Sequence, residues 1–199
     1  MKILAFSDLH HSRDRAEALV ELSRDADLVI GAGDFCNMRQ GLPEALNLLS
    51  GIAAHMVAVP GNAESGDELR EAAHAGTTVL HGEGTEIDGF RFFGLGGGVP
   101  VTPFGPWSFD MTEDVAAEML GRCAEADVLI THSPPKGVVD RASSGRSVGS
   151  TAVREAIERL QPRIVVCGHV HDSWGGEGAI GRARVVNPGP AGTWLELEA

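Results

Sequence analysis

Long apolar segments are missing from this sequence of 199 residues. No run approaches the roughly 20 consecutive apolar residues that a helix needs to cross a bilayer. The first residues, MKILAFSDLHH, do not have the pattern of a signal peptide, because charge appears after only four apolar residues. We therefore expect a cytoplasmic protein without a membrane segment.

Cysteine and positive charge are also scarce. The three cysteines (Cys36, Cys123 and Cys167) are odd in number and widely spaced, which argues against a disulfide framework and a cysteine-rich zinc site. A net charge of −12 disfavours non-specific binding to nucleic-acid polymers and anionic membranes. An anionic substrate would therefore need a cationic centre in the protein to recruit it.

The remaining composition is that of a globular protein. Apolar residues make up 43% of the chain, and we find no internal repeat, low-complexity tract or linker-like segment. The length suits one domain with a sizeable buried core. We predict a single domain over residues 1–199.

Short apolar runs and helix-like stretches alternate along the chain, which indicates an α/β fold. Residues 77–99 instead alternate short strands with glycine, and Asp88-Gly89 favours a hairpin there. Ser65–Glu68 has the pattern of a capping box, and Thr112 that of a helix N-cap. The expected strands are 2–6, 26–34, 55–59, 126–132, 163–171 and two more after residue 182. The expected helices are a stretch with Ala16, Leu19, Val20 and Leu22 on one side, residues 43–50, a helix opened by Ser65–Glu68, residues 111–125 and residues 150–160.

Five of the apolar runs end in polar residues of one chemical kind. All offer oxygen or imidazole nitrogen, and ligands of open α/β sheets bind at such strand exits. Two pairs, Asp8/His10 and His169/His171, are spaced to project to the same side if the chain is extended. The residues are Asp8, His10, Asp34, Asn62, His132, His169 and His171.

This set predicts a metal centre. A single Asp or His at a strand end is most often a cap or a solvated loop residue, but five matching positions favour a shared site. The ligands are too many for one tetrahedral ion and suit two divalent ions, which Asp34 would bridge through its two carboxylate oxygens. The ligand types fit Mn, Fe, Zn or Mg, of which we favour Mn.

The ordered motifs D-L-H, G-D, G-N, H and G-H-V-H, from Asp8 to His171, resemble those of the calcineurin-like metallophosphoesterases. The resemblance implies a four-layer α/β/β/α sandwich with mixed sheets and a binuclear metal centre. It assigns Asp8, His10, Asp34 and His171 to one ion, and Asp34, Asn62, His132 and His169 to the other. A metal-bridging hydroxide would attack phosphorus, so Asp34, Asn62 and His132 are the candidate catalytic residues.

One residue departs from the family pattern. The family has histidine after G-N, thought to protonate the leaving alkoxide, and this chain has Ala63 followed by Glu64. Small phosphodiesterases of the family also lack that histidine, and a leaving aryloxide or phosphate needs no proton. His11 is the candidate replacement donor, or alternation points it away from the site. Glu64 either orients Asn62 or contributes charge to the following helix.

Two loops offer candidate substrate contacts. The segment VPVTPFGPWSF carries Phe104, Trp107 and Phe109, which would either form an apolar wall for a leaving group or anchor the loop in the core. The long loop after His132 carries Arg141 and Arg146, candidate contacts for a substrate phosphate or ordinary solvated residues.

We predict a metal-dependent phosphoesterase, favouring a small phosphodiester over a monoester. The rival from a different class is a metal-binding protein-interaction scaffold of the same fold with little catalysis. A phosphomonoesterase or a nuclease of the same family is also compatible with these motifs. The acidic composition weighs against the nuclease, and the oligomeric state is left open.

Overall fold

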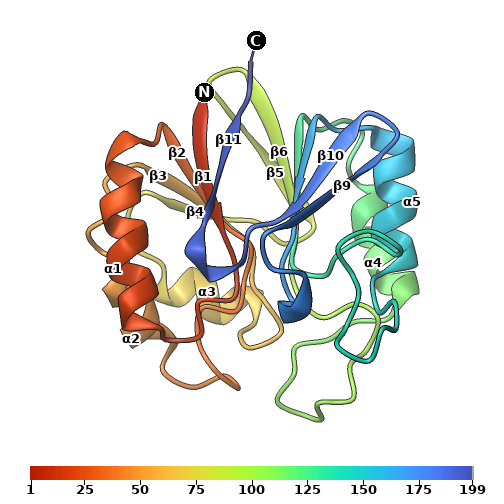
Figure 1. Cartoon of the computed structure of the whole chain (residues 1–199), viewed down its shortest axis with the longest axis horizontal. Coiled ribbons are helices and arrows are strands. Elements are labelled where there is room, and N and C mark those ends of the chain that lie inside the picture. Colours follow the sequence, from red (N-terminus) through yellow and green to blue (C-terminus); the bar gives the residue numbers. More distant parts are fainter. Residues whose placement is uncertain (199) are drawn as a thin grey trace.

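The structure is a computed structural model that describes residues 1–198. Two β-sheets pack face to face, with helices on both outer surfaces (Figure 1). In the first sheet, strands β1 to β4 run parallel and the last strand of the chain pairs antiparallel with β1. Its order is β11 (Thr193–Glu196), β1 (Lys2–Phe6), β2 (Leu28–Gly31), β3 (His55–Ala58) and β4 (Thr77–Val79).

The second sheet has a parallel centre and antiparallel edges. Strands β6, β7, β8 and β10 are parallel neighbours, and the predicted hairpin at Asp88-Gly89 joins β5 to β6. The order is β5 (Glu83–Ile87), β6 (Phe90–Leu95), β7 (Val128–Thr131), β8 (Ile164–Val166), β10 (Ala183–Asn187) and β9 (Gly176–Ile180).

Within residues 1–198, five α-helices complete the sandwich, three beside the first sheet and two beside the second (Figure 1). The predicted four-layer α/β/β/α architecture with mixed sheets is confirmed. The helices of the first side are α1 (Arg13–Leu22), α2 (Leu42–Leu48) and α3 (Gly66–Ala72), and those of the second are α4 (Glu113–Gly121) and α5 (Thr151–Leu160). No helix among residues 1–198 is long and apolar enough to span a membrane.

Each boundary between layers has its own buried core. The central core, between the two sheets, contains side chains such as Ile30, Val57, Phe92, Ile130 and Val166. One outer core joins the first sheet to α1, α2 and α3, and the other joins the second sheet to α4 and α5. Strands buried on both faces explain why runs such as LVIG are continuously apolar.

Side-chain caps fix where the predicted helices begin. The Ser65 hydroxyl accepts the Glu68 N–H while the Glu68 carboxylate accepts the Ser65 N–H, so the predicted capping box is confirmed. Thr112 caps α4 as predicted, and Ser150 caps α5. These caps satisfy N–H groups that a helix cannot bond internally.

The spacing argument for the two histidine-containing pairs was wrong. We expected an extended chain through His171, but β8 ends at Val166 and His171 begins a short 3₁₀-helix. Asp8, His10 and His169 have φ of 54°, 48° and 67°, the left-handed region, so these side chains lie on tight turns. Hydrogen bonds stabilise the first turn, from the His10 N–H to the Asp34 carbonyl (3.0 Å) and from the Asp8 N–H to the Gly33 carbonyl (2.9 Å).

Strand β9 was not predicted. Its sequence, GEGAI, contains two glycines, which have low strand propensity. It is an edge strand held by antiparallel pairing to β10, a long-range constraint that its local pattern does not reveal.

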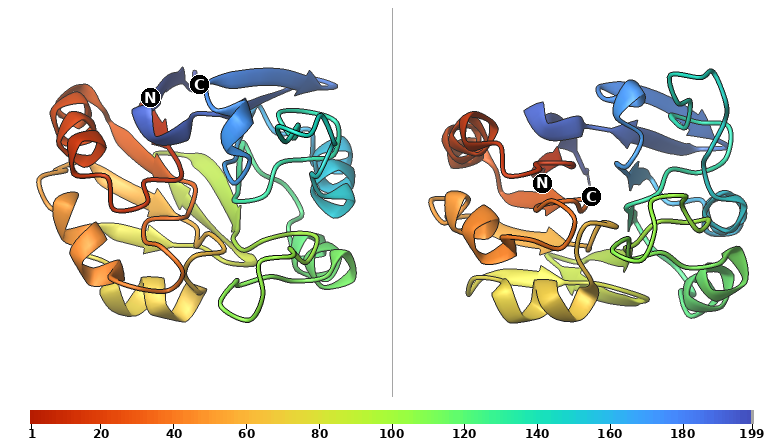
Figure 2. Two further views of the ribbon diagram at one scale, coloured as in Figure 1. Left: turned by 60° about the horizontal axis from the view of Figure 1, so that its bottom comes forward. Right: turned by 90° about the horizontal axis from the view of Figure 1, so that it is seen from below.

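The carboxyl ends of the parallel strands of both sheets point to one end of the molecule, at the bottom of Figure 1. The two views of Figure 2 show the loops after these strands gathered there. A ligand-binding site is therefore expected at this end of the molecule.

Candidate metal centre

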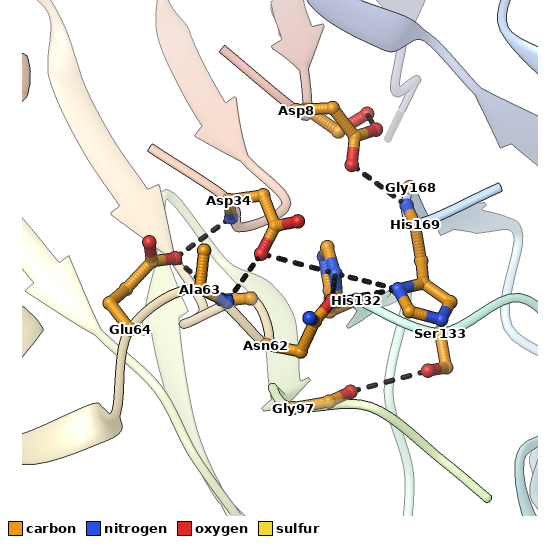
Figure 3. Close-up of polar contacts among 12 residues, drawn as sticks. Asp8, Asp34, Asn62, Ala63, Glu64, Gly97, His132, Ser133, Gly168 and His169 are labelled. Atoms are coloured by element: carbon orange, nitrogen blue, oxygen red, sulfur yellow. Dashed lines mark hydrogen bonds and ion pairs between the residues drawn. The ribbon is translucent and has the colours of Figure 1, made fainter. Parts of the chain in front are cut away.

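The strand exits bring the seven predicted ligands together at this end of the sheets, and Figure 3 shows five of them. Asp8 follows β1, Asp34 follows β2 and Asn62 follows β3, all from the first sheet, while His132 follows β7 and His169 follows β8 in the second. The site thus lies where the two sheets meet, and each sheet supplies part of it. The remaining members are His10 and His171.

Close backbone approach makes this convergence possible. A Cβ on Gly33, whose φ is 89°, would lie 2.5 Å from the Gly61 nitrogen and 2.7 Å from the His132 ring. A Cβ on Gly61 would collide with the Asp34 carboxylate. Glycine at both positions therefore lets the turns after β2 and β3 pack against each other.

The side chains form two groups that share Asp34. In the first group, His171 Nε2 lies 3.2 Å from His10 Nε2 and 3.7 Å from Asp8 Oδ1. In the second, His169 Nδ1 lies 3.2 Å from His132 Nε2 and 2.9 Å from Asn62 Oδ1. Asp8 also lies near the second group, since its carboxylate is within 4.8 Å of ligand atoms of Asp34 and His132.

Asp34 lies between the two groups, with one carboxylate oxygen toward each. Its Oδ2 is 3.5 Å from His10 Nε2, and its Oδ1 is 3.5 Å from His132 Nε2. The Ala63 N–H donates to Oδ1 at 2.8 Å and orients the carboxylate (Figure 3). Although burial opposes ionisation, His132 and His10 hold the pKa of Asp34 below its ordinary value, so the carboxylate is ionised at neutral pH.

Hydrogen bonds outside the centre set the tautomers of two histidines. His132 Nδ1 lies 2.8 Å from the Ala32 carbonyl oxygen, and His10 Nδ1 lies 3.1 Å from that of Cys36. A carbonyl only accepts, so in the neutral ring Nδ1 carries the proton and the Nε2 lone pair faces the centre. Free imidazole lone pairs beside buried carboxylates are the donor set of a metal site, and these residues therefore fit divalent ions.

The amide of Asn62 is oriented by a chain of hydrogen bonds that the sequence did not suggest. Its Nδ2 donates to Ser108 Oγ at 3.0 Å, and Ser108 in turn donates to Asp110 Oδ1 at 2.7 Å. With its NH₂ group held there, Asn62 turns its oxygen toward His132 and His169. The sequence left this orienting role open to Glu64, but Ser108 performs it.

Glu64 has a different role. Its side chain is fully buried and accepts hydrogen bonds from four backbone N–H groups, those of Asp34 (2.8 Å), Phe35 (3.1 Å), Cys36 (3.3 Å) and Gly61 (2.6 Å). Burial, followed by the nearby Asp34 carboxylate, raises its pKa to about 7, against the opposing effect of those N–H groups. Glu64 therefore holds together the turns after β2 and β3.

Trp174 was not singled out from the sequence. Its indole Nε1 donates to Asp8 Oδ2 at 3.0 Å, and its ring lies 4.4 Å from that of His171. Ser7 Oγ donates to the same Asp8 oxygen at 2.6 Å, and the His169 N–H donates to Oδ1 at 3.0 Å. Three donors therefore fix the Asp8 carboxylate, and a tryptophan five residues after His169 gives no periodic signal of such a contact.

His11 lies outside the lining of the cavity over the centre, whereas His169 belongs to that lining. His11 Nε2 lies 2.9 Å from the Gln40 carbonyl oxygen. Burial, followed by the electrostatic effect of His132, lowers the pKa of His169 to about 4, so this ring is neutral at pH 7. A neutral ring is the form that binds a metal.

A cavity of about 710 Å³ lies over the centre. Its lining includes five of the candidate ligands, His10, Asp34, Asn62, His169 and His171. It also includes Pro100, Phe104 and Trp107 from one loop, and Lys136 and Arg146 from another.

The other predicted contacts lie elsewhere. Arg141 is not part of the cavity lining and donates to the Gly145 carbonyl at 3.2 Å. Phe109 is outside the lining as well and packs 5.4 Å from the His81 ring.

A family model, a curated relative and solved structures match this chain. The model of the calcineurin-like phosphoesterase superfamily domain matches residues 1–198. A Caenorhabditis elegans protein named UPF0046 protein K07C11.7 is 30% identical over 201 residues, covering 88% of this chain and 65% of its own length. The chain thus spans less than two thirds of that relative.

Solved structures share the fold. The protein TT1561 of Thermus thermophilus superposes with a TM-score of 0.75 at 22% identity, covering 96% of this chain and 90% of that one. A dimetal phosphatase from Danio rerio superposes with a TM-score of 0.60 at 13% identity, covering 94% and 86%. At these identities the likeness concerns the fold alone.

Proposed function

The chain belongs to the calcineurin-like phosphoesterase superfamily, and we propose that it hydrolyses small phosphodiesters with two divalent metal ions. The family is metal-dependent, and the Asp and His groups of this chain have the donor chemistry that such ions need. What the proposal adds is the number of ions, the role of each residue and the preference for a diester.

The position of Asp34 is the observation that carries the two-ion proposal. Its two carboxylate oxygens face different histidines, His10 and His132, each at 3.5 Å. Asp8, His10, Asp34 and His171 would hold one ion, and Asp34, Asn62, His132 and His169 the other. A single ion would leave one of the two groups of lone pairs unused.

When bound, the ions would supply a nucleophilic water and neutralise negative charge on the phosphoryl oxygens. The protein's own part is orientation. Asp34 is held by the Ala63 N–H, Asn62 by Ser108, and Asp8 by Ser7 and Trp174. Preorganised ligands of this kind avoid the cost of reordering during the reaction.

The preference for a diester rests on the absence of a suitable acid. Ala63 occupies the position where the family pattern has a histidine, and every histidine of the cavity lining belongs to the candidate ligands. A positioned general acid is worth roughly 10²–10⁴ in rate. The substrates cleaved best would therefore have leaving groups that are stable without a proton.

We further propose manganese as the working metal and the cytoplasm as the location. The mixed carboxylate, amide and imidazole set suits Mn²⁺. The three cysteines are all buried and unpaired, which suits a reducing compartment. The substrate would be a small phosphate ester, since a net charge of −12 disfavours nucleic-acid polymers.

Hydrolysis of bis-p-nitrophenyl phosphate beside p-nitrophenyl phosphate tests the proposal. We expect faster cleavage of the diester with added Mn²⁺, and loss of both activities after chelation. Faster cleavage of the monoester would contradict the diester preference. Two bound metals with no turnover of either compound would favour a scaffold of the same fold.

A further inference from the structure

We propose that the cavity takes an esterified nucleoside diphosphate, hydrolysed at the bridge between its two phosphates. This inference rests on the proposed function and narrows it to one substrate class. Three features of the cavity support it independently: a pair of stacked aromatic rings, two cations that form no ion pair, and the absence of a histidine free to act as a general acid.

The aromatic pair would hold a base. The rings of Phe104 and Trp107 are stacked, with centroids 5.8 Å apart and planes 9° apart. Phe104 is 51% exposed, and its ring lies 6.3 Å from that of the candidate ligand His169. An exposed aromatic ring beside the candidate centre is suited to stacking on a planar ring such as a nucleobase.

The two cations would hold the phosphates. The arginines outside the cavity mostly pair with carboxylates, for example Arg39 with Glu68 and Arg184 with Glu177. Among the ion pairs of residues 1–198, neither Lys136 nor Arg146 has a carboxylate partner, although both line the cavity of an acidic protein. Two free cations are more than one diester charge needs and suit a diphosphate.

Apart from the candidate ligand Asp34, Asp172 is the carboxylate of the lining that could oppose phosphate binding. Its Oδ2 accepts the Ser143 N–H at 2.7 Å, which directs that oxygen to the 143 loop. Lys136 is held in place by a 2.8 Å hydrogen bond from Nζ to the Ser147 carbonyl. Neither contact neutralises the charge of Arg146, whereas the buried Asp140 carboxylate, whose pKa Lys136 helps to lower, partly offsets the charge of Lys136.

Because no histidine is free to protonate a leaving group, the bond expected to break is one whose leaving group needs no proton. Apart from the candidate metal ligands, the titratable groups of the lining are Lys136, Arg146 and Asp172. Cleavage of a phosphate bridge releases a phosphate monoester, which leaves readily without protonation, whichever phosphorus is attacked. An alkoxide leaving group would lack a histidine to protonate it.

The reaction balances with water alone. A water oxygen forms a bond to one phosphorus, the bond from that phosphorus to the bridging oxygen breaks, and the electron pair stays on the departing phosphate. The products are two phosphate monoesters, and the two protons of the water pass to solvent or to the products. No oxidation or further reactant is involved.

Four compounds, all assayed with Mn²⁺, test the contributions of the base and of the phosphate bridge separately. The methyl ester of adenosine 5′-diphosphate has both the base and the phosphate bridge. Dimethyl pyrophosphate has the bridge alone, the methyl ester of AMP has the base alone, and bis-p-nitrophenyl phosphate reports the proposed function itself. We expect the first compound to have the highest kcat/KM of the three methyl esters, at least tenfold above each of the other two.

Substitutions at Arg146 and Phe104 test which side chains bind the phosphates and which bind the base. Arg146→Gln should lower kcat/KM for the ADP ester roughly 10- to 100-fold, more than for bis-p-nitrophenyl phosphate, because a charged hydrogen bond is lost. Phe104→Ala should lower the ratio of kcat/KM for the ADP ester to kcat/KM for dimethyl pyrophosphate about tenfold. Arg15→Gln makes the same charge change on an exposed face of α1 and should alter neither ratio.

A binding measurement avoids dependence on turnover. AMP added to metal-free protein should quench Trp107 fluorescence, whereas ribose 5-phosphate should not, and Trp107→Phe should abolish the signal. Equal quenching by both compounds would overturn the stacking assignment. Cleavage of bis-p-nitrophenyl phosphate without preference for the ADP ester overturns this inference alone, and no cleavage of any substrate overturns the proposed function.

Discussion

The carboxylate of Glu64 accepts the backbone N–H of Asp34 at 2.8 Å (Figure 3). It also accepts that of Gly61 at 2.6 Å, so one buried side chain joins the turns after β2 and β3. These turns carry Asp34 and Asn62, which belong to the centre. The distance between the two is therefore set by a residue that does not itself face the cavity.

Replacing Glu64 with Gln should destabilise the fold and weaken metal binding together. The amide turns one of two acceptor oxygens into a donor that faces backbone N–H groups, and we expect a loss of about 3 kcal/mol. Urea unfolding and Mn²⁺ titration measure the two effects. Glu71→Gln, at an exposed position of α3, should change neither. Unaltered stability of the Glu64 variant would refute the assigned role.

Trp174→Phe should lower metal affinity about tenfold while leaving stability nearly unchanged, because it removes the indole donor to Asp8 and keeps most of the ring. Isothermal titration with Mn²⁺ gives the affinity. Trp194→Phe is the matched control, since Trp194 lies on β11 and packs against the core of the first sheet. Equal effects of the two substitutions would mean that the indole N–H contributes nothing to the site.

Glu113 stabilises the start of α5 in a pH-dependent way. Its carboxylate accepts the Ser150 hydroxyl (2.7 Å) and the N–H groups of Thr151 and Ala152 (2.9 Å each). Burial opposes ionisation, but these hydrogen bonds hold the pKa of Glu113 below its ordinary value. The contribution of Glu113 to the free energy of unfolding is therefore present above the unfolded-state pKa. It is lost as pH falls through the lower folded-state pKa.

Glu113→Gln should accordingly cost about 1 kcal/mol at pH 7 and less at acidic pH, once the pH has fallen through the lowered folded-state pKa and the wild-type carboxyl is protonated as well. Chemical denaturation of both proteins at the two pH values measures the difference. Glu155→Gln, at an exposed position on the same helix, provides the control. A difference that grows as pH falls would contradict the assigned sign.

Much of the fold follows from local pattern. Continuous apolar runs predict the central strands, and Ser65 and Thr112 mark the beginnings of α3 and α4. Strand β9 escaped prediction because its glycine-rich sequence is a strand only through pairing with β10. Local propensity does not contain such a constraint.

The residues of the candidate centre could be named from their positions at strand exits, but the contacts that hold them could not. Asp8 and His10 lie on left-handed turns, which alternation in an extended chain does not describe. The contacts from Ser108 to Asn62 and from Trp174 to Asp8 join residues 46 and 166 positions apart. Contacts at such separations arise only when both sheets are assembled.

The central claim is that Asp34 is shared by two metal ions. Metal content per chain, measured beside Mn²⁺-dependent hydrolysis of bis-p-nitrophenyl phosphate, tests it most directly in wild type, Asp34→Asn and the exposed control Asp25→Asn. We expect two ions in wild type and the control. Asp34→Asn should lose metal from both groups and about 1,000-fold in kcat/KM, more than any other ligand substitution. An Asp34→Asn protein with full metal content and full activity would contradict the account.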